Sequence, residues 1–380
     1  MTRFRLLPLA LALVCAAPAR AELPDPITPV LFGFPGQSIA PGSARAAALG
    51  GAGRWLGDEP FHNPALATSG GLVLTPVLQR VSRQDLRADN RNYDDTSVFF
   101  DVLGGWGAQS SGAWTFAVYA HQPLLRHENF AYTRGASAAQ PALIQGRADQ
   151  REYRAGLAVA RRAGAWRFGL AGEWNGRTDT YETTEQSGSP AAGFSHADFS
   201  GGGVGAQAGL RWDGAAPWGG GAALGVGARF VPSLDLDGEQ RFELLMGDST
   251  GAFSVTREKG FEGGLSAAVD ATPTFRVMAS LGGRAGQDWD AFGVRDGTLF
   301  EWKAGGEFHA PDVPWTFRFG FGQEQQKDVA ESRSGVLGLG FGLDFDGTRV
   351  DVGAVRRTLE RDAQPTSYED RVIGSIVLEF

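Results

Sequence analysis

Most of this 380-residue chain alternates, residue by residue, between apolar side chains and small or polar ones. In the stretch 337–345, leucine and phenylalanine occupy every odd position, and glycine or aspartate occupies every even one. Successive side chains of a β-strand point to opposite faces, so such a run predicts a strand with one apolar face. Each run is about ten residues long, which is the length that a tilted strand needs to cross a bilayer.

Counting these runs predicts fourteen strands and an all-β fold, an antiparallel transmembrane β-barrel. The first range is the least regular because it holds Pro76, which cannot donate a hydrogen bond within a sheet. The expected ranges are 70–82, 95–107, 112–122, 147–162, 165–176, 199–213, 219–231, 259–270, 274–286, 298–309, 314–325, 332–346, 348–358 and 367–380.

The connections between these ranges alternate strictly between short and long. Long polar connections include 123–146, 177–198 and 232–258. This alternation is typical of periplasmic turns and external loops. An even number of strands places both termini of the chain on the side of the short turns. The short connections are 109–111, 163–164, 214–218, 271–273, 310–313 and 346–347.

Aromatic side chains gather beside the short connections, which indicates an interfacial belt at one rim of the barrel. The chain also closes on an alternating apolar strand that ends in Phe380. That ending resembles the signal recognised in bacterial outer-membrane barrels, which implies the barrel-assembly machinery as a partner. The belt residues are Trp114, Trp166, Trp212, Trp218, Phe275, Phe308, Trp315, Phe345 and Phe380.

Residues 1–21 have the pattern of a secretory signal peptide. Two arginines precede the apolar run 6–14, and Ala19-Arg20-Ala21 is a small-x-small site, so we expect cleavage after Ala21. The only cysteine, Cys15, lies inside this peptide, and export without disulfides fits a bacterial envelope protein. Cleavage leaves 32 basic residues against 43 acidic ones, a net charge of −11, which argues against nucleic acid as a partner.

Residues 22–69 precede the first strand and predict a small helical plug, while 70–380 form the barrel. The part 22–41 is rich in proline, and Ser43 is a suitable N-cap for a helix over 44–49. Gly50 and Gly51 would end that helix, and a second short helix is possible over 54–59. The small side chains suit a helix that enters a filled barrel.

Inward positions of the strands are often Gly or Ala, which leaves room for a plug or a ligand. Glycines at 169, 225, 305, 320, 338 and 353 belong to this set. The other inward positions carry charges of both signs, and we expect these charges to pair with one another and with the plug. They are Arg154, Arg167, Glu173, Arg229, Arg276, Glu301, Lys303, Glu307, Arg318, Asp351 and Arg371.

The stretch 42–67 contains a small-residue segment, GSARAAALGGAG, followed by Asp58-Glu59 and then Asn63-Pro64-Ala65. It resembles the start of the FadL-type outer-membrane transporters and the related PorV-like barrels. The resemblance implies fourteen strands, an N-terminal hatch in the lumen, and a side passage through the wall near a kinked strand. It implies gate residues at the Asn-Pro-Ala step, namely Asn63, Pro64 and Ala65. We add the glycines of the plug, Gly50, Gly51 and Gly53, as candidate gate residues.

The function that follows from this resemblance is outer-membrane transport of hydrophobic small molecules of the fatty acid or hydrocarbon type. The alternatives are a PorV-like assembly or secretion-accessory barrel with protein partners, and a polar pore, against which the plug argues. We expect a monomer surrounded by outer-membrane lipid. The residues that could line a hydrophobic path are Trp55, Phe61, Leu66, Phe194, Leu245, Met246 and Phe253.

No other chemistry is indicated. The run 50–53 follows no strand and lacks a phosphate-binding motif, so it predicts no cofactor. The five histidines are scattered, which predicts no metal site, although His121 and His127 beside a long connection leave a lipase-like barrel enzyme as an alternative. Asp235 and Asp237 could suggest calcium, but Asp-rich turns are common. We expect no enzyme activity.

Overall fold

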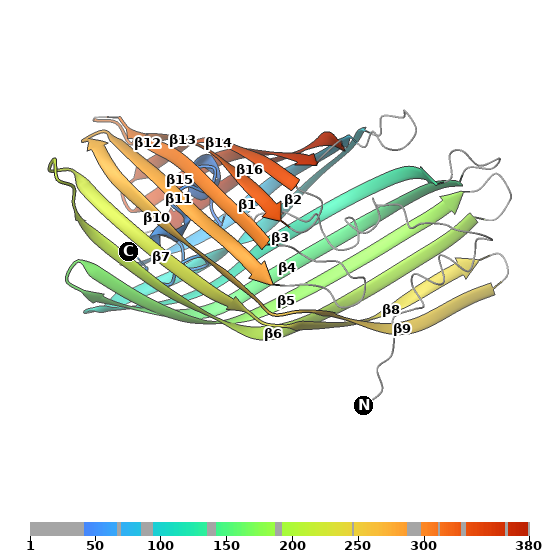
Figure 1. The fold of residues 1–380 in the computed structure, drawn as a ribbon. Coiled ribbons are helices and arrows are strands. Elements are labelled where there is room, and N and C mark those ends of the chain that lie inside the picture. The colour runs from blue at the N-terminus through green and yellow to red at the C-terminus, as the bar shows by residue number, and fades with distance from the viewer. Residues whose placement is uncertain are drawn as a thin grey trace.

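The structure is a computed structural model that describes residues 42–66, 70–84, 94–134, 142–186, 192–244, 247–286, 298–310, 312–327, 332–361 and 364–378. Its strands form one antiparallel sheet that closes on itself, because β1 pairs with both β2 and β16, and β5 pairs with β6. Figure 1 shows the resulting barrel from the side. No helix in the described part of the chain is long and apolar enough to cross a membrane.

The strands of the first half of the chain include the longest ones, β2 to β6. They are β1 (Gly70–Gln84), β2 (Asp94–Ser111), β3 (Trp114–Arg134), β4 (Ala142–Ala163), β5 (Trp166–Gln186), β6 (Ala192–Ala215), β7 (Gly221–Val231) and β8 (Leu234–Leu244). The second half holds β9 (Gly247–Arg257), β10 (Gly260–Thr272), β11 (Phe275–Gly286), β12 (Thr298–His309), β13 (Trp315–Lys327), β14 (Ser332–Phe345), β15 (Thr348–Arg361) and β16 (Gln364–Leu378).

These sixteen segments build a ring of fourteen strands. Strands β7 and β8 both pair with β6 and are the two halves of one long strand, interrupted at Pro232 and Ser233. Likewise β9 pairs with β8 and β10 pairs with β7, with an interruption at Glu258 and Lys259. The predicted fourteen-stranded antiparallel barrel is therefore confirmed.

The prediction of long external loops was wrong over much of 123–146, 177–198 and 232–258. Strands β3 to β6 continue through these stretches, and β8 and β9 form a paired hairpin. The strand lengths expected from the sequence are those needed to cross a bilayer, whereas these strands continue beyond it. The stretch 177–184 holds four threonines and a tyrosine but no Gly or Pro, so nothing ends its ladder. We call this end of the barrel the long-strand end, and the opposite end the short-turn end.

The short connections are confirmed, and several are tight turns with glycine in the left-handed region. Gly112, Gly164 and Gly347 have φ of 61°, 61° and 74°. The first turn lies at 112–113 rather than 109–111, because the Ser110 hydroxyl bonds to that of Thr115 across the two strands at 2.8 Å. Serine was taken there as a turn residue, but it belongs to the ladder.

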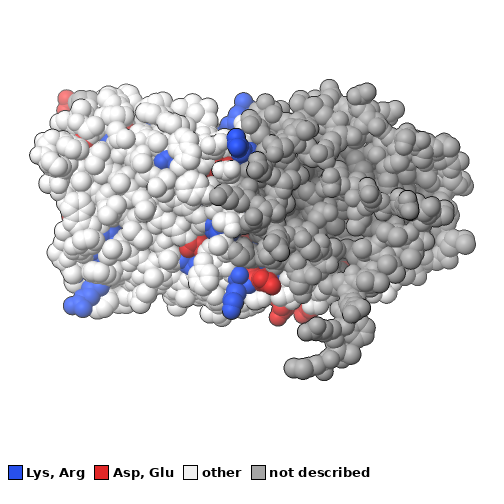
Figure 2. Space-filling model, in the orientation of Figure 1, with Lys and Arg blue, Asp and Glu red and all other residues white. Residues whose placement is uncertain are grey.

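The outer face of the described barrel is apolar. Figure 2 shows it as a broad uncharged surface with few acidic or basic side chains. The expected belt is present at the short-turn rim, where Trp114, Trp166, Trp218, Trp315 and Phe345 are exposed. A second set of exposed aromatics lies nearer the long-strand end, at Tyr153, Trp174, Phe261, Phe300, Trp302 and Phe321. Two aromatic rows that flank an apolar band are the usual pattern of a barrel in a membrane.

Several predicted features lie outside the described residues. These are the signal peptide 1–21 with its cleavage site, the segment 22–41, and Phe380 at the end of the chain. Pro76, which made the first strand irregular, does lie within β1. The β1–β2 register shifts between Thr75 and Pro76, and Leu103 is left opposite no residue. The proline is accommodated by this bulge, where a ladder hydrogen bond is missing in any case.

Residues 42–66, here called the luminal segment, lie inside the barrel toward its short-turn end (Figure 1). The segment contains α3 (Ala44–Ala48) and the 3-10 turn η1 (Arg54–Leu56). The Ser43 hydroxyl accepts from the Ala46 N–H at 3.2 Å, so the predicted N-cap is confirmed. The second helix is shorter than the possible 54–59, because Gly57 adopts a left-handed conformation with φ of 79° and ends it.

Candidate functional site

The wall approaches the luminal segment most closely at its glycines. A Cβ on Gly320 or Gly353 would lie less than 3.0 Å from the carbonyl oxygens of Leu49 and Ala44, respectively. Real Cβ atoms do not come that close, so backbone packs directly against backbone at these positions. The expected inward glycines at 169, 225, 305, 320, 338 and 353 all contact the segment, which places small residues on β5, β7 and β12 to β15.

The glycines of the segment itself shape its turn. Gly50, Gly51 and Gly53 have φ of 60°, 88° and 81°, a region that other residues rarely adopt. They carry the chain from α3 back to η1, beside the Lys303 side chain and Met278. These three predicted gate residues therefore form a tight reversal inside the lumen.

Asn63 ties the Asn-Pro-Ala step to η1 and fixes both to the wall. Its side-chain amide donates to the carbonyl oxygens of Trp55 at 2.6 Å and Leu210 at 3.2 Å, and its Oδ1 accepts from the Ala65 N–H at 2.9 Å. Pro64 and Ala65 lie against Gly169 of β5. The Asn-Pro-Ala step is thus placed against β5 and β6.

The predicted path residues divide into two groups. Trp55 is buried against the inner glycines of β7, β10 and β11. Phe61 stacks on His121 of β3, with ring centroids 4.7 Å apart, and Leu66 is buried among apolar side chains of β1 to β5. Phe194 and Phe253 belong to β6 and β9, but their side chains lie outside the described part, as do Leu245 and Met246 entirely.

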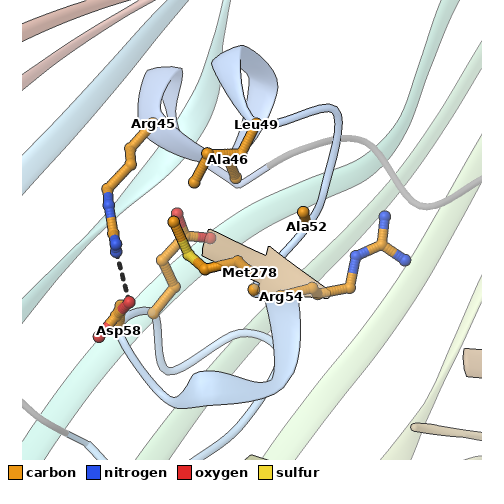
Figure 3. A pocket seen from close by; sticks show the side chains of 9 residues that line it. Arg45, Ala46, Leu49, Ala52, Arg54, Asp58 and Met278 are labelled. Atoms are coloured by element: carbon orange, nitrogen blue, oxygen red, sulfur yellow. Dashed lines mark hydrogen bonds and ion pairs between the residues drawn. The ribbon is translucent and has the colours of Figure 1, made fainter. Parts of the chain in front are cut away.

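One chain of ion pairs anchors Arg45. Its guanidinium donates to both carboxylate oxygens of Glu307, at 2.7 and 2.9 Å, and pairs with Asp58 (Figure 3). Glu307 in turn pairs with Arg318 at 2.8 Å, and Arg318 with Asp351 at 2.6 Å. Helix α3 is thereby linked to β12, β13 and β15.

A second chain anchors Arg54 of η1. Arg54 pairs with Glu301 at 2.7 Å, and Glu301 with Lys303 at 2.8 Å. The chain continues through Glu324, which lies 3.1 Å from Lys303 and 2.7 Å from Arg357. All five side chains are buried, so every charge of this chain depends on its neighbours for stabilisation.

A third chain crosses the lumen above the luminal segment, and we call it the charge ladder. It runs Arg257–Glu152–Arg154–Glu262–Arg229–Glu173, with N···O distances of 2.8 to 3.1 Å. The Tyr119 hydroxyl donates to Glu173 at 2.5 Å and ends the ladder on β3. Arg229 also donates to the Phe61 carbonyl oxygen, which joins the ladder to the segment.

The remaining predicted inward charges have other neighbours. Arg167 donates to the Leu66 carbonyl oxygen at 2.7 Å. Arg276 lies 3.8 Å from Asp270, and Arg371 is buried on the inner face of β16. Arg211 of β6, which the sequence did not single out, donates to the Leu56 carbonyl oxygen at 2.6 Å and pairs with Asp58 at 2.8 Å.

Two neighbouring carboxyl groups of the segment differ in ionisation. Burial would raise the pKa of Asp58, but the arginines at 45 and 211 hold that pKa well below its usual value. Burial raises the pKa of Glu59 to about 7, against the hydrogen bond that Ser43 donates to it. Next to Glu59, burial and the charge of Arg54 lower the pKa of His62 well below its ordinary value, so this imidazole is neutral.

The cavities beside the segment are small. One of about 20 Å³ lies between Arg45, Asp58 and Met278, and Figure 3 shows the side chains around it. A second of about 10 Å³ adjoins Trp55 and Glu301. Volumes of this size hold about one water molecule each. At the level of these cavities, the described side chains leave no room for a hydrocarbon.

Among the described residues, the largest of the buried apolar clusters lies on one side of the inner wall, and smaller ones lie at β14 to β16 and at β7, β10 and β11. Buried side chains of β1 to β5 and β16 form a single cluster with Phe61 and Leu66 of the luminal segment. Its wall members are Val73, Trp106, Ala108, Ala117, Tyr119, Ala158, Ala160, Ala171 and Val377. The charge chains described above draw mostly on β7 and β9 to β15, so the lumen has an apolar sector and a charged sector.

The apolar sector contains an opening in the hydrogen-bond ladder. Pairing of β2 with β3 ends at Gly104 and His121, although β1–β2 pairing continues to Asp94 and β3–β4 pairing to Arg134. Within the described residues, 94–103 and 122–134 are therefore joined by no ladder, and we call this region the β2–β3 seam. The Gln122 side chain donates across it to the Val102 carbonyl oxygen at 2.8 Å.

The sequence did not identify several residues of this site. Glu152 and Glu262 share the inward parity of their strands and could have been found by extending the alternation. Arg257 was assigned to a loop, and the partners of Arg45 and Arg54 depend on the folded barrel. The kinked strand implied by the family resemblance has a counterpart in β3, whose register shifts between His121 and Leu124, and the segment residue that contacts it is Phe61.

Solved structures with the same architecture include the following three. A Pseudomonas aeruginosa FadL homologue aligns over 91% of this chain and 100% of its own, with a TM-score of 0.64 and 10% identity. The Pseudomonas putida toluene transporter TodX aligns over 89% and 98%, with a TM-score of 0.62 and 12% identity. The CymD monoaromatic hydrocarbon channel aligns over 90% and 98%, with a TM-score of 0.61 and 12% identity.

Comparisons of the sequence give less information than those of the structure. No protein-family model matches the chain, and no curated protein matches it. The structural likeness at 10 to 12% identity nevertheless extends over nine tenths of this chain and almost the whole of each channel. The chain therefore has the fold of the FadL-type outer-membrane transporters, as the resemblance of residues 42–67 predicted.

Proposed function

We propose that the protein is an outer-membrane channel through which hydrophobic small molecules leave sideways, at the β2–β3 seam. The observation that carries this proposal is the end of β2–β3 pairing at Gly104 and His121, beside the apolar sector. A closed barrel normally pairs every strand along its length in the membrane, because unpaired backbone groups in lipid are costly. An interruption next to buried apolar side chains suits the passage of an apolar solute.

The luminal segment supports the same proposal by filling the axial path. Its glycine contacts and ion pairs reach β5 to β7 and β10 to β15, and the adjoining cavities have room only for water. In this proposal the segment acts as a plug, and the Asn-Pro-Ala step holds it in place. The hydrocarbons that TodX and CymD carry, according to their descriptions, are the ligand class that we propose for this chain.

Further parts of the proposal come from the sequence. The signal peptide is cleaved after Ala21, the barrel is delivered by an assembly machinery that reads the strand ending in Phe380, and the mature protein is a monomer in outer-membrane lipid. The short-turn end faces the periplasm, and the protein is a transporter rather than an enzyme. A toluene-sized hydrocarbon is the probe of choice, while a long-chain fatty acid is the second ligand to test.

The seam can be closed chemically because Cys15 is the only cysteine of the chain and lies in the predicted signal peptide. In cells that take up radiolabelled toluene, the two thiols of the variant Val102→Cys/Gln122→Cys would be joined by a short bifunctional thiol-reactive reagent whose spacer contains a reducible disulfide. We expect at least tenfold slower uptake after cross-linking and recovery after reduction. The control is Phe321→Cys/Leu337→Cys, a pair on the continuous β13–β14 ladder.

Equal uptake with the seam open and closed would contradict lateral exit. Absence of any protein-dependent uptake of toluene or of a fatty acid would contradict the transport function as a whole. In that case, a stoichiometric protein partner copurifying with the barrel would support the PorV-like accessory alternative.

A further inference from the structure

We propose that the charge ladder is a neutral polar floor across the lumen, which turns hydrophobic solutes away from the axis and toward the β2–β3 seam. This inference rests on the proposed function and adds to it a set of specificity-determining residues. The ladder residues are Glu152, Arg154, Glu173, Arg229, Arg257 and Glu262.

The ladder spans the lumen rather than following the wall. Arg154 belongs to β4 and Glu262 to β10, and β5, β6 and β7 stand between these two strands in the ring. The pair is nevertheless bidentate, with Nη1 and Nη2 donating at 3.0 and 2.9 Å. Side chains on strands so far apart in the wall can meet only by reaching across the interior.

The ladder lies at the level where the seam begins. Arg154 is the register partner of His121, and His121 is the register partner of Gly104, the last pair of the β2–β3 ladder. A solute that enters from the long-strand end therefore meets the ladder and the start of the seam at the same depth. Phe61, whose carbonyl oxygen accepts from Arg229, supports the ladder from below.

The composition of the ladder suits a floor. Three arginines and three glutamates alternate, so the net charge is zero, and no member is more than 6% exposed. Removing one partner of a buried pair leaves an uncompensated charge, which is strongly unfavourable. A hydrocarbon cannot replace any of these partners, so it cannot enter the ladder without breaking it.

Stability alone does not explain the ladder. Well-packed apolar residues of similar volume stabilise a fold as well as a buried ion pair, and often better. On β4 and β5, which carry three of the ladder residues, other buried positions hold apolar side chains such as Ala158, Ala160 and Ala171. We therefore attribute the charged residues of the ladder to their exclusion of hydrophobic solutes from the axial path.

The test replaces the central pair with apolar residues of similar length, in the variant Arg154→Met/Glu262→Met. The control is Arg356→Met/Asp370→Leu, which removes an ion pair between β15 and β16, away from the ladder. Unheated electrophoresis in SDS would first show that both variants form the barrel. Two readouts follow: equilibrium dialysis of radiolabelled toluene against purified protein, and toluene uptake by cells.

We expect the ladder variant to bind toluene at least tenfold more tightly than the wild type and to deliver it at least tenfold more slowly, because an apolar floor retains the solute. The control should match the wild type in both. Unchanged binding and uptake in the ladder variant would overturn the inference while leaving the proposed function intact. Wild-type protein that transports no toluene would refute the proposed function. The comparison of toluene binding between the ladder variant and the wild type would still test the inference about the ladder.

Discussion

Replacement of Asn63 by alanine should loosen the luminal segment without harming the barrel. The Asn63 side chain makes three hydrogen bonds, to Trp55, Leu210 and Ala65, and is fully buried. A net contribution of about 1 kcal/mol for each bond gives a loss of roughly 3 kcal/mol. A loss of this size corresponds to a more than hundredfold increase in the fraction of molecules whose segment is released.

A buried cysteine can measure that fraction directly. Ala52 is 2% exposed and lies between α3 and η1, so Ala52→Cys introduces a small, protected thiol. Its rate of reaction with a water-soluble maleimide, divided by the rate in the unfolded chain, reports how often the segment opens. We expect Asn63→Ala to accelerate labelling about a hundredfold in this background.

The control for this experiment is Asn175→Ala. Asn175 is an equally buried asparagine on β5, and its amide bonds to no side chain or backbone group in the described part of the chain. Its replacement should leave the labelling rate within about twofold of the parent. If Asn63→Ala also labels at the parental rate while the barrel remains folded, the Asn-Pro-Ala step does not hold the segment, and the reasoning fails.

Three further outcomes follow from the same geometry. The pKa of Glu59 is about 7 when the segment is docked and 4.5 ordinarily, so docking of the segment takes up a proton. Between pH 4.5 and pH 7, the protection of the Ala52→Cys thiol from labelling should therefore fall as the pH rises. The variant Glu59→Gln should abolish that dependence once labelling rates are normalised to the unfolded chain. Gly320→Val should raise the opening rate at least tenfold because its side chain meets the Leu49 backbone, whereas Gly335→Val, where a Cβ has open space, should not. The unheated protein should migrate faster in SDS than the boiled chain, and equal mobility would count against a closed barrel.

The strand count could be predicted because it depends on local information. The period of an alternating run such as 337–345 can be read directly from its residues, and each short turn contains a glycine or another residue that favours turns. The extent of the strands could not be predicted in the same way. Beyond the apolar band, β5 continues through Arg177 to Gln186 with polar side chains on both faces, so no membrane signal marks its end.

The inward direction of the charges could also be predicted, since parity along a strand fixes the face. Their partners could not, because Arg154 and Glu262 are 108 residues apart and meet only when the ring has closed. The same holds for Arg45 and Glu307, which are 262 residues apart. Sequence pattern thus locates the charges on a surface, and closure of the barrel decides which of them become pairs.

The division of the lumen into two sectors explains how a lumen filled by the luminal segment is compatible with the proposed passage of a solute. On the charged side, backbone contacts at Gly320 and Gly353 and the ion pairs of Arg45 and Arg54 leave only water-sized spaces. A hydrocarbon gains nothing there, because it would have to separate buried charges. On the apolar side, Phe61 and its neighbours in the cluster offer apolar side chains beside the charge ladder, and the seam interrupts the wall at that same place. In the proposed function, the apolar solute therefore has one favourable direction to move, and it leads through the wall.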